Sequence, residues 1–109
     1  MPMKTLTKAF NTATVEKGER FRIELEADST TGYLWDIRLK AGAASLISQE
    51  YKHQEEPGEF VCGGQAIEEL VYQAGQQSGQ TIEIEATYSR PFVPNDPTAD
   101  KRLFRITIA

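Results

Sequence analysis

The sequence predicts an all-β protein, an antiparallel β-sandwich of about seven or eight strands. Apolar and polar residues alternate with a period of two in several segments, which is the pattern of a strand with one buried face. Turn-forming residues separate these segments at short intervals. The chain has 109 residues, of which 39% are hydrophobic, so it can bury one modest core. We therefore expect a single domain over residues 1–109.

Four segments show the alternation most clearly, and each predicts a half-buried strand. Their apolar members are Phe21, Ile23 and Leu25; Trp35, Ile37 and Leu39; Ile82, Ile84, Ala86 and Tyr88; and Phe104, Ile106 and Ile108.

Three further strands are expected around Leu6–Thr14, Leu46–His53 and Ile67–Ala74. The third segment is also compatible with a helix, because its apolar residues recur at helical spacing among good helix formers. We favour a strand there, because the neighbouring segments are strands and short antiparallel connections would otherwise be lost.

Turns are predicted between the strands, at Glu16–Glu19, Asp28–Gly32, Lys40–Gly42, Glu56–Gly58, Gly75–Gly79 and Pro91–Pro97. About seven short strands joined in this way within about a hundred residues are typical of the immunoglobulin-like architecture. The cystine that joins the sheets in antibody domains is absent, because Cys62 is the only cysteine.

Charge and hydropathy argue against two kinds of partner. The net charge is −4 and no basic block could follow a phosphate backbone, so we expect no nucleic acid. No apolar run approaches the roughly 20 residues of a membrane segment. The first ten residues lack the apolar stretch of a signal peptide, and the compartment stays open: periplasmic or secreted if a signal was trimmed, otherwise cytoplasmic.

Metal and covalent chemistry are poorly supported. His53 and Cys62 are each the only residue of their type, and no metal-ligand spacing occurs, so we expect no metal and no cofactor. A Cys62–His53 catalytic pair would still need an orienting third group and a shaped cleft. We expect a binding protein that is not an enzyme.

Three loops carry unusual residues, and loops at one end of a sandwich are a natural place for recognition. The first, Asp28–Tyr33, offers the hydroxyls of Thr30 and Thr31 beside Gly32, which can take positive φ. The second contains the pair Gly63-Gly64, which lets backbone approach another surface closely. The third contains Arg90, Pro91 and Phe92, and both arginine and aromatic residues are enriched at interfaces.

Each loop also has a purely structural interpretation. The first is compatible with an ordinary turn in which Tyr33 and Trp35 seal the core. The glycine pair would suit a flexible connection, and Phe92 could pack inward at a strand end. Taken one at a time, the loops do not identify a function.

Taken together and in this order, the loops resemble those of the chagasin family of cysteine peptidase inhibitors. That family carries an Asn-Pro-Thr-Thr-Gly-aromatic loop, a Gly-x-Gly-Gly loop and an Arg-Pro-aromatic loop, usually Arg-Pro-Trp. The matching segments here are Thr30–Tyr33, Gly63-Gly64 and Arg90–Phe92. The chain departs from the pattern at Asp28-Ser29, at Val61 and at Phe92, and the missing proline of the first loop predicts a less preorganised binding surface.

The resemblance implies a reversible, steric inhibitor of papain-like cysteine peptidases. Separately, we expect the chain to be a monomer. Thr30, Thr31 and Gly32 would then block the catalytic centre, with Tyr33 supporting the loop. Gly63 and Gly64 would lie along the substrate subsites, and Arg90, Pro91 and Phe92 would contact the opposite side of the cleft.

One alternative shares the fold without this partner. An immunoglobulin-like adhesion or carbohydrate-binding module would use Tyr33 and Trp35 as a stacking platform for a ligand. Titration of a papain-like peptidase with the purified chain distinguishes the two functions.

Overall fold

All regular secondary structure in the described residues is β-strand, as the alternation predicts. The computed structural model describes residues 3–28, 32–53 and 65–109. Its strands are β1 (Lys4–Leu6), β2 (Thr12–Val15), β3 (Arg20–Asp28), β4 (Leu34–Ala41), β5 (Ala44–His53), β6 (Gln65–Ala74), β7 (Thr81–Ser89) and β8 (Asp100–Ile108). Within these ranges, no helix suitable for crossing a membrane is present.

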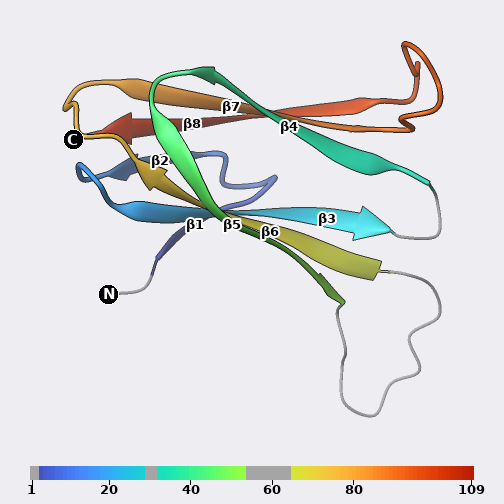
Figure 1. Cartoon of the computed structure of the whole chain (residues 1–109), viewed down its shortest axis with the longest axis horizontal. Helices are drawn as coiled ribbons and strands as arrows, with labels where there is room; N and C mark the ends of the chain where they lie inside the picture. The colour runs from blue at the N-terminus through green and yellow to red at the C-terminus, as the bar shows by residue number, and fades with distance from the viewer. Residues whose placement is uncertain (1–2, 29–31, 54–64) are drawn as a thin grey trace.

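The eight strands form two four-stranded sheets that pack face to face (Figure 1). The strand order is β1-β3-β6-β5 in one sheet and β2-β8-β7-β4 in the other. Neighbouring strands are antiparallel except for the outermost pairs β1–β3 and β2–β8, which are parallel. The expected β-sandwich of seven or eight strands is therefore confirmed.

The first part of the chain differs from the single strand expected around Leu6–Thr14. A turn interrupts it, in which the Thr7 amide donates to the Phe10 carbonyl at 2.9 Å and the Phe10 amide donates to the Thr7 hydroxyl. Because of this turn the chain leaves one sheet after β1 and joins the other as β2. The prediction of one continuous strand was wrong, since local alternation does not show a change of sheet.

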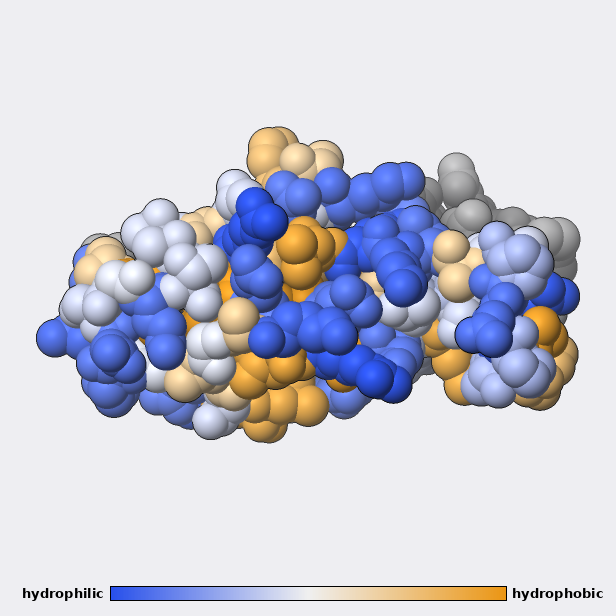
Figure 2. All heavy atoms as spheres, turned by 90° about the horizontal axis from the view of Figure 1, so that it is seen from above, coloured by the Kyte–Doolittle hydropathy of each residue, from blue (hydrophilic) through white to orange (hydrophobic). Residues whose placement is uncertain are grey.

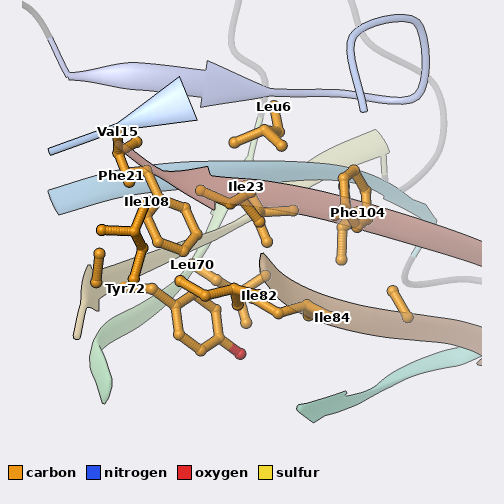
Figure 3. Close-up of a cluster of buried hydrophobic side chains, with 14 of the residues drawn as sticks. Leu6, Val15, Phe21, Ile23, Leu70, Tyr72, Ile82, Ile84, Phe104 and Ile108 are labelled. Carbon is orange, nitrogen blue, oxygen red and sulfur yellow. The ribbon is translucent and has the colours of Figure 1, made fainter. Parts of the chain in front are cut away.

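The core lies between the sheets and is built from the alternating residues predicted for it. Side chains from both sheets point toward one another in this layer (Figure 3). Each fully buried Val, Leu, Ile or Phe side chain contributes roughly 1.5–3 kcal/mol relative to an exposed position. The residues no more than 1% exposed are Leu6, Val15, Phe21, Ile23, Leu25, Leu70, Ile82, Ile84, Ala86, Phe104, Ile106 and Ile108.

The segment for which a helix was also possible is the central strand β6. It pairs with β3 on one side and β5 on the other, with Tyr72 opposite both Phe21 and Leu46. The rings of Phe21 and Tyr72 stack with their centroids 5.7 Å apart. Because β6 forms backbone hydrogen bonds with a strand on each side, it is a strand despite the helix-forming tendency of its residues.

The edge strands β4 and β5 follow the alternation less strictly. Leu39 was expected on the buried face of its strand, but it is 43% exposed. The pairing of β4 with β7 is irregular between Leu39 and Ala41, and β4 is the last strand of its sheet, so no further strand covers this residue. A similar irregularity in β5 separates Leu46 from Ser48.

Three pairs of consecutive strands have their connections at one end of the sandwich. The end of β3 pairs with the beginning of β6, Asp28 opposite Gln65, and the end of β5 lies beside them, His53 opposite Ala66. In the other sheet Leu34 of β4 is opposite Ser89, the last residue of β7. All these strand ends lie toward the right in Figure 1. We call this the loop end of the molecule.

Candidate functional site

The connection between β7 and β8, residues 90–99, begins with a tight turn at the loop end. The Val93 amide donates to the Arg90 carbonyl at 3.0 Å, and Pro91 occupies the second position of this turn, where proline is favoured. Proline cannot donate to a ladder, and β7 indeed ends at Ser89. Phe92 is 71% exposed, so the alternative in which it packs inward is wrong.

Arg90 is directed into its own connection. Its Nε and Nη2 atoms donate to the two carboxylate oxygens of Asp96, each at 3.0 Å, and its backbone amide donates to the same carboxylate at 3.0 Å. The Asp96 side chain is only 1% exposed, whereas that of Arg90 is 33% exposed. A bidentate arginine–carboxylate pair is stronger than an ordinary neutral hydrogen bond, and it fixes the direction in which the Arg90 guanidinium points.

Thr98 completes the surroundings of the Asp96 carboxylate. Its backbone amide donates to Asp96 Oδ1 at 2.9 Å and its hydroxyl donates to the same oxygen at 2.7 Å. The hydrogen bonds from Arg90, followed by the one from the Thr98 hydroxyl, hold the pKa of Asp96 well below its ordinary value, although burial acts in the opposite direction. The carboxylate is therefore charged throughout the physiological pH range.

Tyr33 links the first loop to this connection. Its hydroxyl lies 2.5 Å from the Thr98 hydroxyl oxygen, and the Arg90 guanidinium carbon lies 5.6 Å from the centre of its ring. The Tyr33 ring also stacks on Tyr88 of β7, with centroids 5.1 Å apart. These contacts fix the Tyr33 side chain against β7 and the connection that follows it.

Gly32 places the first loop against the third. Its φ is +78°, a conformation that favours glycine, and a Cβ built on it would lie 3.5 Å from Cε1 of Phe92. Two loops that are far apart in the sequence are therefore in contact. Gly32, Tyr33, Arg90 and Phe92, predicted as site residues from motifs alone, form one cluster at the loop end.

The remaining predicted site residues lie outside the described residues. These are Thr30 and Thr31 of the first loop and Gly63 and Gly64 of the second. Cys62 also lies there, and of His53 only the backbone is described, so the Cys62–His53 alternative is not tested.

Trp35 takes no part in an exposed platform. It is 9% exposed, its indole N–H donates to the Glu26 carbonyl at 3.0 Å, and one face is covered by the Arg102 guanidinium at 4.9 Å from the ring centre. Tyr88 packs against it at 4.6 Å between centroids. A buried indole offers no face for sugar stacking, which disfavours the carbohydrate-binding alternative.

Sequence reasoning missed three residues of this cluster. Asp96 and Thr98 lie in a segment predicted only as a turn, and a turn acid is normally solvated, so nothing in the sequence indicated burial. Leu34 is 62% exposed beside a cavity of about 280 Å³ that Gly32 and Tyr33 also line. The signal for Leu34 was present: it is an apolar residue in the outward phase of the Trp35 strand.

Across the parts of the chain that the structure describes, no cluster of three or more His, Cys, Asp or Glu side chains could hold a metal ion. The polar groups of the cluster are also bonded to one another, which suits a fixed surface for recognition.

The chain belongs to the chagasin family of peptidase inhibitors. The model of the chagasin family peptidase inhibitor I42 matches residues 14–108, nearly the whole chain. Members of this family inhibit peptidases and are not enzymes, which confirms the expectation that the chain is not a catalyst.

Three proteins are similar to this chain over most of its length. Amoebiasin-1 of Entamoeba histolytica is 34% identical over 98 residues, which cover 89% of this chain and 87% of that protein. The cysteine protease inhibitor EhICP2 of the same organism has a TM-score of 0.77 at 25% identity, with 98% of this chain and 96% of that one covered. Amebosin has a TM-score of 0.69 at 28% identity, and both chains are fully covered.

A more distant structure shares the fold. PbICP-C, solved in complex with falcipain-2, has a TM-score of 0.60 at 21% identity, covering 98% of this chain and 91% of that one. At this identity the likeness supports the β-sandwich architecture alone.

Proposed function

We propose that this chain, acting as one domain and as a monomer, is a reversible inhibitor of papain-like cysteine peptidases that covers the active-site cleft with its loop end. Family membership supplies the inhibitor class, and EhICP2 is an inhibitor of cysteine proteases. PbICP-C bound to falcipain-2 is an example of this fold in contact with a protease.

The observation that carries the proposal is the contact between the first and third loops. Gly32 lies against Phe92, and the Tyr33 hydroxyl is hydrogen-bonded to Thr98, so the described residues of the first motif lie beside the third loop, which supports the proposal. In this proposal Thr30, Thr31 and Gly32 enter the cleft, Gly63 and Gly64 follow the substrate subsites, and Pro91 and Phe92 contact the opposite wall.

The structure suggests a different role for Arg90 from the one implied by resemblance. Two guanidinium N–H groups of Arg90 donate to Asp96, so in this proposal Arg90 helps to shape the loop, and the exposed side chains of Phe92 and Leu34 provide apolar contact. Three loops on one cleft are compatible with the roughly 1,600 Å² of a standard protein–protein interface.

Inhibition is steric in this proposal. The inhibitor fills the cleft without presenting a peptide bond to the catalytic thiolate, so it is released uncut. No cofactor takes part.

The test is titration of papain with the purified chain, using a small fluorogenic substrate. We expect concentration-dependent inhibition, recovery of activity after large dilution, and an intact chain by mass spectrometry after long incubation. No inhibition of any member of a panel of papain-like peptidases by a folded sample would contradict the proposal. Inhibition accompanied by stoichiometric cleavage of the chain would contradict its steric, reversible form.

A further inference from the structure

Among the residues that the structure describes, Asp96 is the one charged or polar residue that is buried. It accepts five hydrogen bonds, three from Arg90 and two from Thr98. A buried carboxylate is stable only when it is paired and hydrogen-bonded, and this one is saturated by neighbours from its own connection.

These bonds tie the two ends of the connection to one group. Arg90 is its first residue and Thr98 lies two residues before β8, so the carboxylate fixes the base of the segment that displays Phe92. Asn95, next to Asp96, has φ +53°, an unusual value for a residue other than glycine. Asparagine adopts this left-handed conformation more readily than other non-glycine residues, and here it turns the chain immediately before the buried carboxylate.

The same network extends to the first loop. The Thr98 hydroxyl has a single proton, which it donates to the charged Asp96 carboxylate. The Tyr33 hydroxyl, 2.5 Å away, must therefore donate to Thr98. A directed chain runs from Tyr33 through Thr98 to Asp96, and such chains are cooperative, because each bond polarises the next.

We propose that Asp96 is a positioning residue of the inhibitory surface, which holds the Phe92 turn and Tyr33 in their binding arrangement before the peptidase arrives; this inference rests on the proposed inhibitor function. Ordering several side chains on binding opposes association, and a surface ordered in advance avoids that cost. The chain lacks the proline that stiffens the first loop in the family pattern, and Asp96 offers a different means of stiffening, applied from the third loop.

Asp96→Asn is the direct test, because the amide has nearly the same shape but must turn a donor toward either Arg90 or Thr98. We expect the inhibition constant for papain to rise about 10- to 100-fold. The loss should lie mainly in the association rate, because only a fraction of molecules would present the competent surface. Asp100→Asn is the matched control, since this acid is 52% exposed in its side chain and pairs with Arg102, and we expect it to inhibit like the parent chain.

A double-mutant cycle with Phe92→Ala separates positioning from direct contact or general instability. If Asp96 acts by placing the Phe92 turn, Asp96→Asn should weaken inhibition much less in the Phe92→Ala background than in the parent chain. Fully additive losses would overturn the proposal. Thr98→Val, which removes one hydroxyl and keeps the backbone bond, should weaken inhibition in the same direction and provides the test if Asp96→Asn does not fold.

Different experimental results would contradict the inhibitor function and the positioning role of Asp96. A folded parent chain that does not inhibit would overturn the proposed function and the role of Asp96 with it. A parent chain that inhibits, with Asp96→Asn or Thr98→Val inhibiting equally well, would overturn the role of Asp96 alone.

Discussion

The Asp96 carboxylate connects the folding stability of this chain to pH. Its pKa is lowered in the folded state by the bonds from Arg90 and Thr98, relative to an ordinary value of 3.8. A lowered folded-state pKa means that the stabilisation is complete above the unfolded-state value and is lost as the pH falls toward the folded-state value.

We therefore expect the stability difference between the parent chain and Asp96→Asn to be constant above about pH 5 and to shrink progressively below about pH 4. Melting temperatures of both proteins, recorded by circular dichroism from neutral to strongly acidic buffers, provide the measurement. A difference that is independent of pH down to acid unfolding would show that the carboxylate charge is unimportant.

Gly32 and Gly79 have similar backbone conformations in different parts of the molecule, so Gly79 is a suitable control for substitution of Gly32. Their φ values are +78° and +82°, and a Cβ would meet Phe92 at ordinary contact distance in the first case and nothing within 4 Å in the second. Replacing either by alanine imposes similar backbone strain, about 1 kcal/mol of unfolding free energy.

Urea unfolding should thus give similar losses for Gly32→Ala and Gly79→Ala, while only Gly32→Ala should weaken inhibition of papain. The reason is that Gly32 lies in the first loop and Gly79 lies in the turn before β7. Equal inhibition by the two variants would argue against a role for the first loop.

At the scale of elements, two neighbouring residues of β8 show which face of the strand is buried. Phe104 is fully buried and its neighbour Leu103 is 37% exposed. Phe104→Ala should lower the free energy of unfolding by about 3–5 kcal/mol, whereas Leu103→Ala should cost less than about 1 kcal/mol. Comparable losses in denaturant unfolding would indicate a register shifted by one residue.

The central strands were predictable from sequence, because a face buried against the other sheet imposes a period of two on Phe21–Leu25 and Ile82–Ala86. The division of the first segment into β1 and β2 was not predictable, since the parallel pairing of each depends on distant partners. The exposure of Leu39 depends on an irregularity at the edge of a sheet, which also leaves no local pattern.

In the candidate site, too, some residues could be predicted from the sequence and others could not. Motifs in loop order identified Gly32, Tyr33, Arg90 and Phe92, and the fold brings these together. The motifs gave no indication of Asp96, because its burial results from bonds within a ten-residue connection rather than from any periodic pattern. The internal pairing of Arg90 is likewise a consequence of tertiary structure.

At the scale of the whole molecule, two packed sheets carry the proposed recognition surface at one end. Strand ends from both sheets lie at that end (Figure 1), whereas much of the face seen in Figure 2 is hydrophilic, with apolar residues in separate groups. A peptidase cleft would therefore meet the edges of both sheets rather than the face of either.

Two exposed phenylalanines allow this claim to be tested directly. Phe92 is 71% exposed at the loop end, and Phe10 is 72% exposed in the turn between β1 and β2. The same substitution to alanine therefore removes the same ring, at nearly equal exposure, from two different places on the molecule.

The most direct measurement is the inhibition constant for papain of Phe92→Ala and of Phe10→Ala, each compared with the parent chain. The account predicts at least about a tenfold rise for Phe92→Ala, as for the loss of an aromatic interface residue, and no change for Phe10→Ala. Unchanged inhibition by Phe92→Ala together with weakened inhibition by Phe10→Ala would place the inhibitory surface elsewhere and contradict the account.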